Sequence, residues 1–144
     1  MSQENVEVIR ALMPEPDTDV AAMFRQLRDP ELAEVARKAV DRLFHPEFEA
    51  VAFYTPTRYR GPDGLRDFWL DWLEPWATYY IGIETILADS DRVLVRSHDR
   101  GRRHDMDEEV EVRGGSIWTF KGGKIVLAEF LPSGQGVESA WVSE

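Results

Sequence analysis

Apolar residues near the start of the chain recur every three or four positions, which is the spacing of one helical face. Ser2 can cap a first helix, and the prolines at positions 14 and 16 are expected to end it. Asp17 or Thr18 can open a second, shorter helix. The apolar positions of these two helices are Val6, Ile9 and Met13, followed by Val20, Met23, Phe24 and Leu27.

A third helix is predicted to begin at Asp29–Pro30, because a capping carboxylate followed by proline favours a first helical turn. His45–Pro46 is expected to end it. The residues from Phe48 to Tyr54 are β-branched, aromatic or small and indicate a strand. The third helix is expected to bury one face, made of Leu32, Val35, Ala36, Ala39, Val40 and Leu43.

A strongly aromatic helix is predicted from about Leu65 to Trp76, after a turn at Gly61–Gly64. Large rings suit both a packed core and a pocket for a flat molecule. Core packing and ligand contact therefore both remain open for its tryptophans. The apolar stripe of this helix is Leu65, Phe68, Trp69, Trp72, Leu73 and Trp76.

The second half of the chain changes to long strand-like runs, at residues 78–88, 92–102, 109–120 and 124–131. The connectors Asp89–Asp91 and Gly122–Gly123 are turn sequences, so neighbouring strands are expected to form antiparallel hairpins. Helices, one strand, one helix and then about four strands indicate an α+β fold rather than a doubly wound parallel sheet.

Composition and charge narrow the classes of function. A chain of 144 residues with five Trp, four Tyr and seven Phe predicts one folded domain over residues 1–144. The 27 Asp and Glu outnumber the 17 Lys and Arg, and the formal net charge of −10 disfavours nucleic acid and anionic membrane surfaces as partners. There is no cysteine, which excludes disulfides and thiolate zinc sites. MSQENVEVIR carries no signal-peptide pattern, so we expect a cytoplasmic protein.

Five segments along the chain are MSQENVEVIR, FHPEFEA, YRGPDGLRDFW, DSDRVLVRS and SIWTFKGGKIVLAEF. In this order and spacing, the chain resembles the SnoaL-like polyketide cyclase-related branch of the nuclear transport factor 2-like superfamily. The resemblance spans nearly the whole chain. It implies a cone, in which a curled antiparallel sheet wraps around the N-terminal helices and an apolar interior holds the ligand. It also implies homodimers that pair through the outer face of the sheet.

The known chemistries of this superfamily do not map simply onto the chain. Alignment with its ketosteroid isomerases puts Ala52 and Ser116 where two catalytic aspartates would stand, so that mechanism is disfavoured. Its epoxide hydrolases use an Asp-Arg-Asp arrangement, and the counterpart here is Arg103–Asp105 alone. These residues lie at an expected hairpin tip, where exposure to solvent prevents strong pKa shifts. Its dehydratases use two histidines inside the cone, and here only His98 lies on a predicted strand.

Asp99 is the candidate catalytic residue, and its role depends on strand register. Adjacent residues of a strand point to opposite faces, and the alignment implied by the resemblance turns Val95, Ser97 and Asp99 inward. On that register Asp99 is a buried acid or base, with Ser97, Ser116 and Tyr54 as polar neighbours. The alternative is an exposed Asp99 near a frayed strand end that pairs with an arginine.

The acidic run Asp105–Glu109 raises the question of a metal site, because calcium prefers several oxygen ligands. The run lacks the glycine and the spacing of an EF-hand loop. Arginines lie just upstream, so a solvated hairpin with cross-strand ion pairs is the simpler interpretation. We therefore expect neither a metal nor a cofactor.

These considerations predict a cone-fold protein that binds a small hydrophobic molecule. It is expected to act as a cofactor-free cyclase, isomerase or dehydratase on a hydrophobic or polyketide-like substrate. A non-catalytic ligand-binding or dimerisation module is the alternative. Trp69 and Trp118 are expected to be largely buried. The predicted ligand-binding residues, beside the catalytic Asp99, are Tyr54, Trp69, Trp72, Ser97, Ser116, Trp118 and Phe130.

The outer sheet face is predicted to pair two copies of the chain, since an apolar face is unfavourable in water. The alternative is that the segment from Val137 to Val142 folds back and covers this face. The residues expected to point outward are Ile117, Thr119, Ile125, Leu127 and Leu131.

Overall fold

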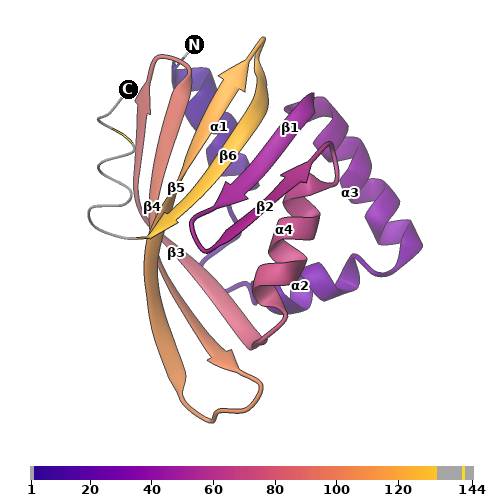
Figure 1. The fold of residues 1–144 in the computed structure, drawn as a ribbon, viewed down its shortest axis with the longest axis vertical. Coiled ribbons are helices and arrows are strands. Elements are labelled where there is room, and N and C mark those ends of the chain that lie inside the picture. Colours follow the sequence, from indigo (N-terminus) through magenta and orange to yellow (C-terminus); the bar gives the residue numbers. More distant parts are fainter. Residues whose placement is uncertain (1, 133–140, 142–144) are drawn as a thin grey trace.

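A computed structural model describes residues 2–132 and Trp141 (Figure 1). Three helices come first, followed by two strands, a fourth helix and four further strands. The elements are α1 (Ser2–Leu12), α2 (Val20–Gln26), α3 (Pro30–Leu43), β1 (Phe44–Ala52), β2 (Thr55–Arg60), α4 (Gly64–Leu73), β3 (Trp76–Asp89), β4 (Arg92–Arg103), β5 (Glu109–Lys121) and β6 (Lys124–Pro132).

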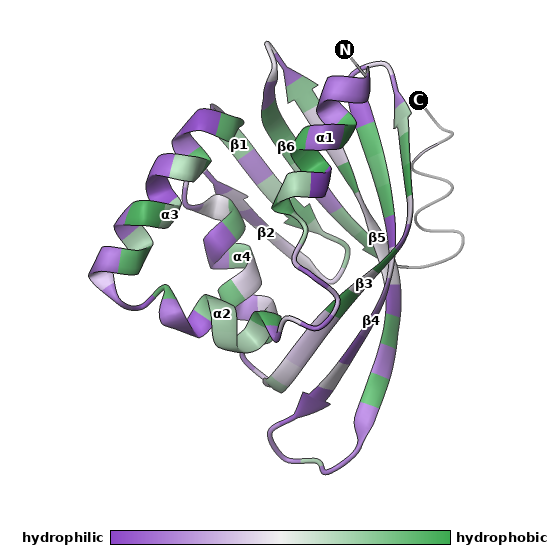
Figure 2. Cartoon of the chain, turned by 180° about the vertical axis from the view of Figure 1, so that it is seen from behind, coloured by the Kyte–Doolittle hydropathy of each residue, from purple (hydrophilic) through white to green (hydrophobic). Residues whose placement is uncertain are grey.

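The strands form one six-stranded sheet in the order β2-β1-β6-β5-β4-β3. All neighbouring strands are antiparallel except β1 and β6, which are parallel. The long strands β3, β4 and β5 curl along the whole molecule, and the helices lie over one face of the sheet (Figures 1 and 2). The predicted α+β fold with helices and a curled sheet is confirmed, and the sheet departs from the predicted antiparallel arrangement where β1 pairs with β6.

Aspartates cap two of the helices. Asp29 accepts a hydrogen bond from the Glu31 amide at 2.9 Å and precedes Pro30, as predicted for α3. The cap of α2 is Asp19 rather than Asp17 or Thr18. The Asp19 carboxylate also accepts from the Tyr79 amide at 3.0 Å, so this cap ties α2 to β3.

The strand predicted from Phe48 to Tyr54 corresponds to the second half of β1 and the turn after it. β1 begins earlier, at Phe44, directly after α3, and β2 was not predicted. Pro46 lies where the pairing of β1 with β6 is irregular, so its missing amide hydrogen breaks no regular ladder. Pro56 is tolerated in β2 because β2 is the edge strand of the sheet. These two prolines explain why the hairpin was missed.

The buried face expected for α3 is not formed. No residue of α3 is buried, and Val35 is 68% exposed. Only the C-terminal part of the helix contacts the core, through Val40 and Leu43. Arg37 ties the exposed side to the start of α4 through an ion pair with Asp63 at 3.0 Å.

The outer sheet face is partly covered by the chain itself. Leu94 and Ile117 are buried there and pack against Leu131 and Trp141. The prediction that Ile125 points outward was wrong: a register shift between Thr119 and Phe120 turns Ile125 into the core. Of the fold-back segment proposed for this face, only Trp141 lies within the described residues.

Candidate functional site

A cavity of about 190 Å³ lies between α4, the β1–β2 turn and the concave face of the sheet. Its wall is mostly apolar. The structure brings all eight predicted site residues to this wall: Tyr54, Trp69, Trp72, Ser97, Asp99, Ser116, Trp118 and Phe130. It also adds residues that the sequence analysis missed, among them Phe53, Phe68, Tyr79, Ile81 and Ile83.

Aromatic rings in contact with one another form much of the cavity wall. From the mouth inward, the centroid distances are 5.3 Å for Tyr54–Trp72, 6.1 Å for Trp72–Tyr79, 6.3 Å for Tyr79–Trp69 and 5.8 Å for Trp69–Phe130. The last three pairs meet edge to face, the geometry that the ring quadrupoles favour. The predicted helix was too long, since α4 ends at Leu73, but Trp69 and Trp72 still face this wall.

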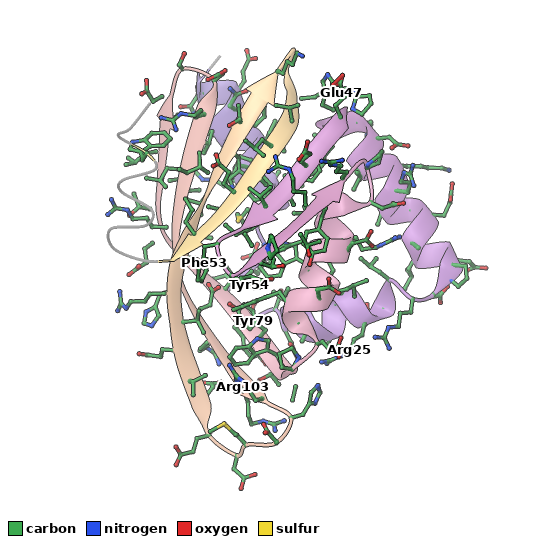
Figure 3. All side chains as sticks on the ribbon, in the orientation of Figure 1. Arg25, Glu47, Phe53, Tyr54, Tyr79 and Arg103 are labelled. Carbon is green, nitrogen blue, oxygen red and sulfur yellow. The ribbon has the colours of Figure 1, made fainter. Side chains whose placement is uncertain are left out.

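Two exposed aromatic side chains stand at the mouth of the cavity. Phe53 and Tyr54 form the turn between β1 and β2 and are 61% and 43% exposed. Figure 3 shows them beside α4, on the same side of the molecule as Tyr79. Tyr54 contacts Phe68 and Trp72 of α4, and its pKa is raised by burial and by the nearby negative charge of Asp71. The mouth is thus aromatic and lies near a carboxylate.

Asp99 is the buried carboxyl group of the cavity, with only 8% of the residue exposed. Its Oδ2 accepts a hydrogen bond from the Tyr79 hydroxyl at 2.7 Å. Its Oδ1 is buried and has no hydrogen-bond partner within the described part of the chain. Burial raises the pKa of Asp99 from 3.8 to about 6, and the neighbouring hydroxyl groups of Tyr79 and Ser97, followed by the charge of His98, oppose this shift in part. The alternative of an exposed Asp99 paired with an arginine was wrong.

Tyr79 was missed because a β-bulge decides which tyrosine faces Asp99. The register set by the turn after Asp89 would place Gly82 opposite Asp99, and hence Tyr80 on the same face. A register shift between Ile83 and Thr85 instead places Ile81 opposite Asp99 and brings Tyr79 to it. Burial, followed by the charge of Asp99, raises the pKa of Tyr79 far above its ordinary range, so Tyr79 acts as a donor.

Two serines add hydroxyl groups to the wall. Ser116 is buried, and its Oγ accepts a hydrogen bond from Trp118 Nε1 at 2.8 Å, which fixes the indole ring. Ser97 lies on the same strand face as Asp99. Both hydroxyl groups line the cavity and can orient a polar group of a ligand.

The opposite face of β4 carries charges that belong to the surface. His98 Nε2 lies 3.4 Å from Glu111 Oε1, and Arg100 pairs with Glu109 at 2.8 Å. The cross-strand ion pairs expected near the acidic run are therefore present. Within residues 2–132 and Trp141, no three His, Asp or Glu side chains converge as a metal ligand set. No helix in the same part of the chain is long and apolar enough to cross a membrane.

Solved structures share this fold at low sequence identity. A protein of Jannaschia sp. CCS1 described as a SnoaL-like polyketide cyclase has a TM-score of 0.68 at 15% identity, covering 92% of this chain and 87% of its own. TerC, co-crystallised with polyporic acid, has a TM-score of 0.60 at 16% identity, covering 97% and 96%. A ketosteroid isomerase-like protein from Catenulispora acidiphila, in complex with trimethylamine, has a TM-score of 0.58 at 14% identity, covering 72% and 79%.

At the level of sequence, the chain matches the model of a domain family. No curated protein matches the chain significantly. The SnoaL-like domain matches residues 20–128, which include seven of the eight predicted site residues and leave out Phe130. With this match over most of its length, the chain belongs to the SnoaL-like domain family.

Proposed function

We propose that the cavity binds a small, mostly apolar organic molecule and that Asp99 exchanges a proton with it. The observation that carries this proposal is the Asp99 carboxyl, which is buried in an aromatic cavity with one oxygen, Oδ1, left without a hydrogen-bond partner among the described residues. A buried polar atom without a hydrogen bond is unfavourable, so a ligand that offers a hydrogen to Oδ1 gains from satisfying it.

The pKa of Asp99 suits a general base. Because this pKa is about 6, most of the carboxyl is ionised at neutral pH and yet remains more basic than an ordinary aspartate. Tyr79 holds Oδ2, which leaves Oδ1 to take a proton from a C–H or O–H bond of the ligand. Ser97 and Ser116 would orient the ligand. The proton returns to another ligand atom, so the isomerisation, cyclisation or dehydration needs no cofactor.

The comparisons support a role in small-molecule chemistry. Proteins of this fold have been crystallised with polyporic acid and with trimethylamine, and others are described as polyketide cyclases or an epoxide hydrolase. The complexes of proteins of this fold with such molecules support the proposal that the cavity here takes a small molecule. We also propose a homodimer through the outer sheet face, where the exposed Leu87 adjoins Leu94.

The test uses a neutral binding probe and a chromogenic C–H acid. N-phenyl-1-naphthylamine should fluoresce on entering the cavity, and 5-nitrobenzisoxazole reports base catalysis when its C–H proton is removed and its N–O bond breaks to give a coloured phenolate. The wild-type rate should rise with pH through about 6. Asp99→Asn, which keeps an acceptor for Tyr79, should lower the rate by roughly 10²-fold.

Asp67→Asn is the matched control, because Asp67 lies on the exposed side of α4 and pairs with Arg66. It should leave both readouts unchanged. If the probe binds but Asp99→Asn reacts as fast as the wild type, Asp99 is not the base and the non-catalytic binding module stands. If the probe does not bind to the folded protein, the cavity is not a ligand site.

A further inference from the structure

We propose that the natural ligand of this cavity is a cation, a small organic molecule with a protonated or quaternary amine whose charge lies beside Asp99 Oδ1 and among the aromatic rings. This inference rests on the proposed function in taking the same cavity as the binding site, and it adds the charge class of the ligand.

The charges around the cavity all favour a positive ligand. Asp99 is the buried carboxylate of the lining, and its Oδ1 has no partner in the described part of the chain. Arg113 is the only basic residue of the described lining, but its guanidinium is largely exposed and pairs with Glu84 at 3.6 Å. Asp71 adds a second carboxylate near Tyr54 at the mouth. The net charge of −10 draws cations towards the protein as a whole.

The aromatic wall is the second feature that fits a cation. Rings attract a positive charge through their negative faces, and the attraction strengthens where water is excluded. Here Trp69 and Trp72 each pack against Tyr79, whose hydroxyl holds Asp99, and all four residues line the same cavity. A carboxylate beside such rings offers an ammonium group both a counter-charge and neighbouring aromatic rings.

The test compares three soluble molecules of nearly the same shape: choline, 3,3-dimethylbutan-1-ol and 3,3-dimethylbutanoate. Calorimetry near pH 8 should give the affinity order cation, neutral, anion, with choline at least roughly tenfold tighter than the alcohol. In Asp99→Asn choline should lose most of this advantage, whereas the affinity of the alcohol should change little. Asp67→Asn should behave as the wild type.

Two further readouts are specific to the charge. Choline should lower the Asp99 pKa, followed through the carboxyl carbon by NMR, and its affinity should fall as the pH drops through about 6. The other ionisable groups near this region are Tyr79 and Tyr54, whose pKa values are raised, Arg113 of the lining and Asp71 at the mouth. His98 lies on the opposite sheet face, and its positive form lowers the Asp99 pKa. Asp71→Asn should therefore leave the pH midpoint unchanged.

The outcomes separate this inference from the proposed function. If the alcohol binds as tightly as choline, or if Asp99→Asn keeps the preference, the charge class is wrong while the cavity remains a ligand site. If none of the three molecules nor N-phenyl-1-naphthylamine binds, both proposals are wrong.

Discussion

The buried carboxyl of Asp99 couples the stability of the protein to pH. Folding raises its pKa from 3.8 to about 6, so the folded state binds the proton more tightly than the unfolded state. The stability this gives is fully present below about pH 4 and is lost as the pH rises through 6. A shift of about two units corresponds to roughly 3 kcal/mol.

Asp99→Asn is expected to remove this dependence. Urea unfolding at several pH values should show this. Between pH 4 and pH 7, the free energy of unfolding of the variant should rise relative to that of the wild type by up to roughly 3 kcal/mol. Taking the difference between the two proteins cancels the titration of the surface carboxylates. Parallel pH profiles of the two proteins would show that folding does not perturb Asp99.

Single residues of the site could be read from the sequence where alternation alone decides their direction. Ser97 and Asp99 follow Val95 along a regular strand, and all three line the cavity. Tyr79 could not be identified, because one extra residue at the β3 bulge reverses which tyrosine faces inward. Phe53 was missed because a strand over residues 48–54 points it to the face opposite Tyr54, whereas both residues lie in the β1–β2 turn and line the cavity.

At the scale of elements, the two tryptophans of the wall differ in how far they are buried. Trp118 on β5 is 2% exposed, as expected, and donates a hydrogen bond to Ser116, whereas Trp69 on α4 is partly buried. Trp69 keeps more exposed surface because it faces the cavity.

We expect Trp118→Ala to lower the free energy of unfolding by roughly 3–5 kcal/mol and Trp69→Ala to lower it by less. Urea unfolding followed by circular dichroism measures both. The cavity left by Trp118 cannot collapse easily, because Phe130 already packs against its ring at 5.8 Å. A larger loss of unfolding free energy for Trp69→Ala than for Trp118→Ala would contradict the assignment of Trp69 to the cavity wall and Trp118 to the core.

At the scale of the whole molecule, the sequence predicted the residues on the sheet face that the helices cover better than those on the outer face. The inner side could be predicted because its large apolar residues alternate along the strands. The outer side depends on Trp141, far along the chain, whose ring lies 4.6 Å from the Arg92 guanidinium and whose carbonyl accepts from Arg92 at 2.8 Å. Such a contact leaves no periodic signal.

Trp141 also sets the last prediction, on self-association. It packs against Leu94 and Ile117 but leaves Leu87, which pairs with Leu94 across the strands, exposed for contact with a second copy. Light scattering of the wild type at micromolar concentration should give about twice the 16.6 kDa mass of one chain. Trp141→Ala should expose Leu94 and Ile117 and so strengthen association, because uncovered apolar area favours contact between copies. Val35→Ala, on the exposed side of α3, is the control and should leave the mass unchanged. A monomer mass for both the wild type and Trp141→Ala would reject the outer face as an interface.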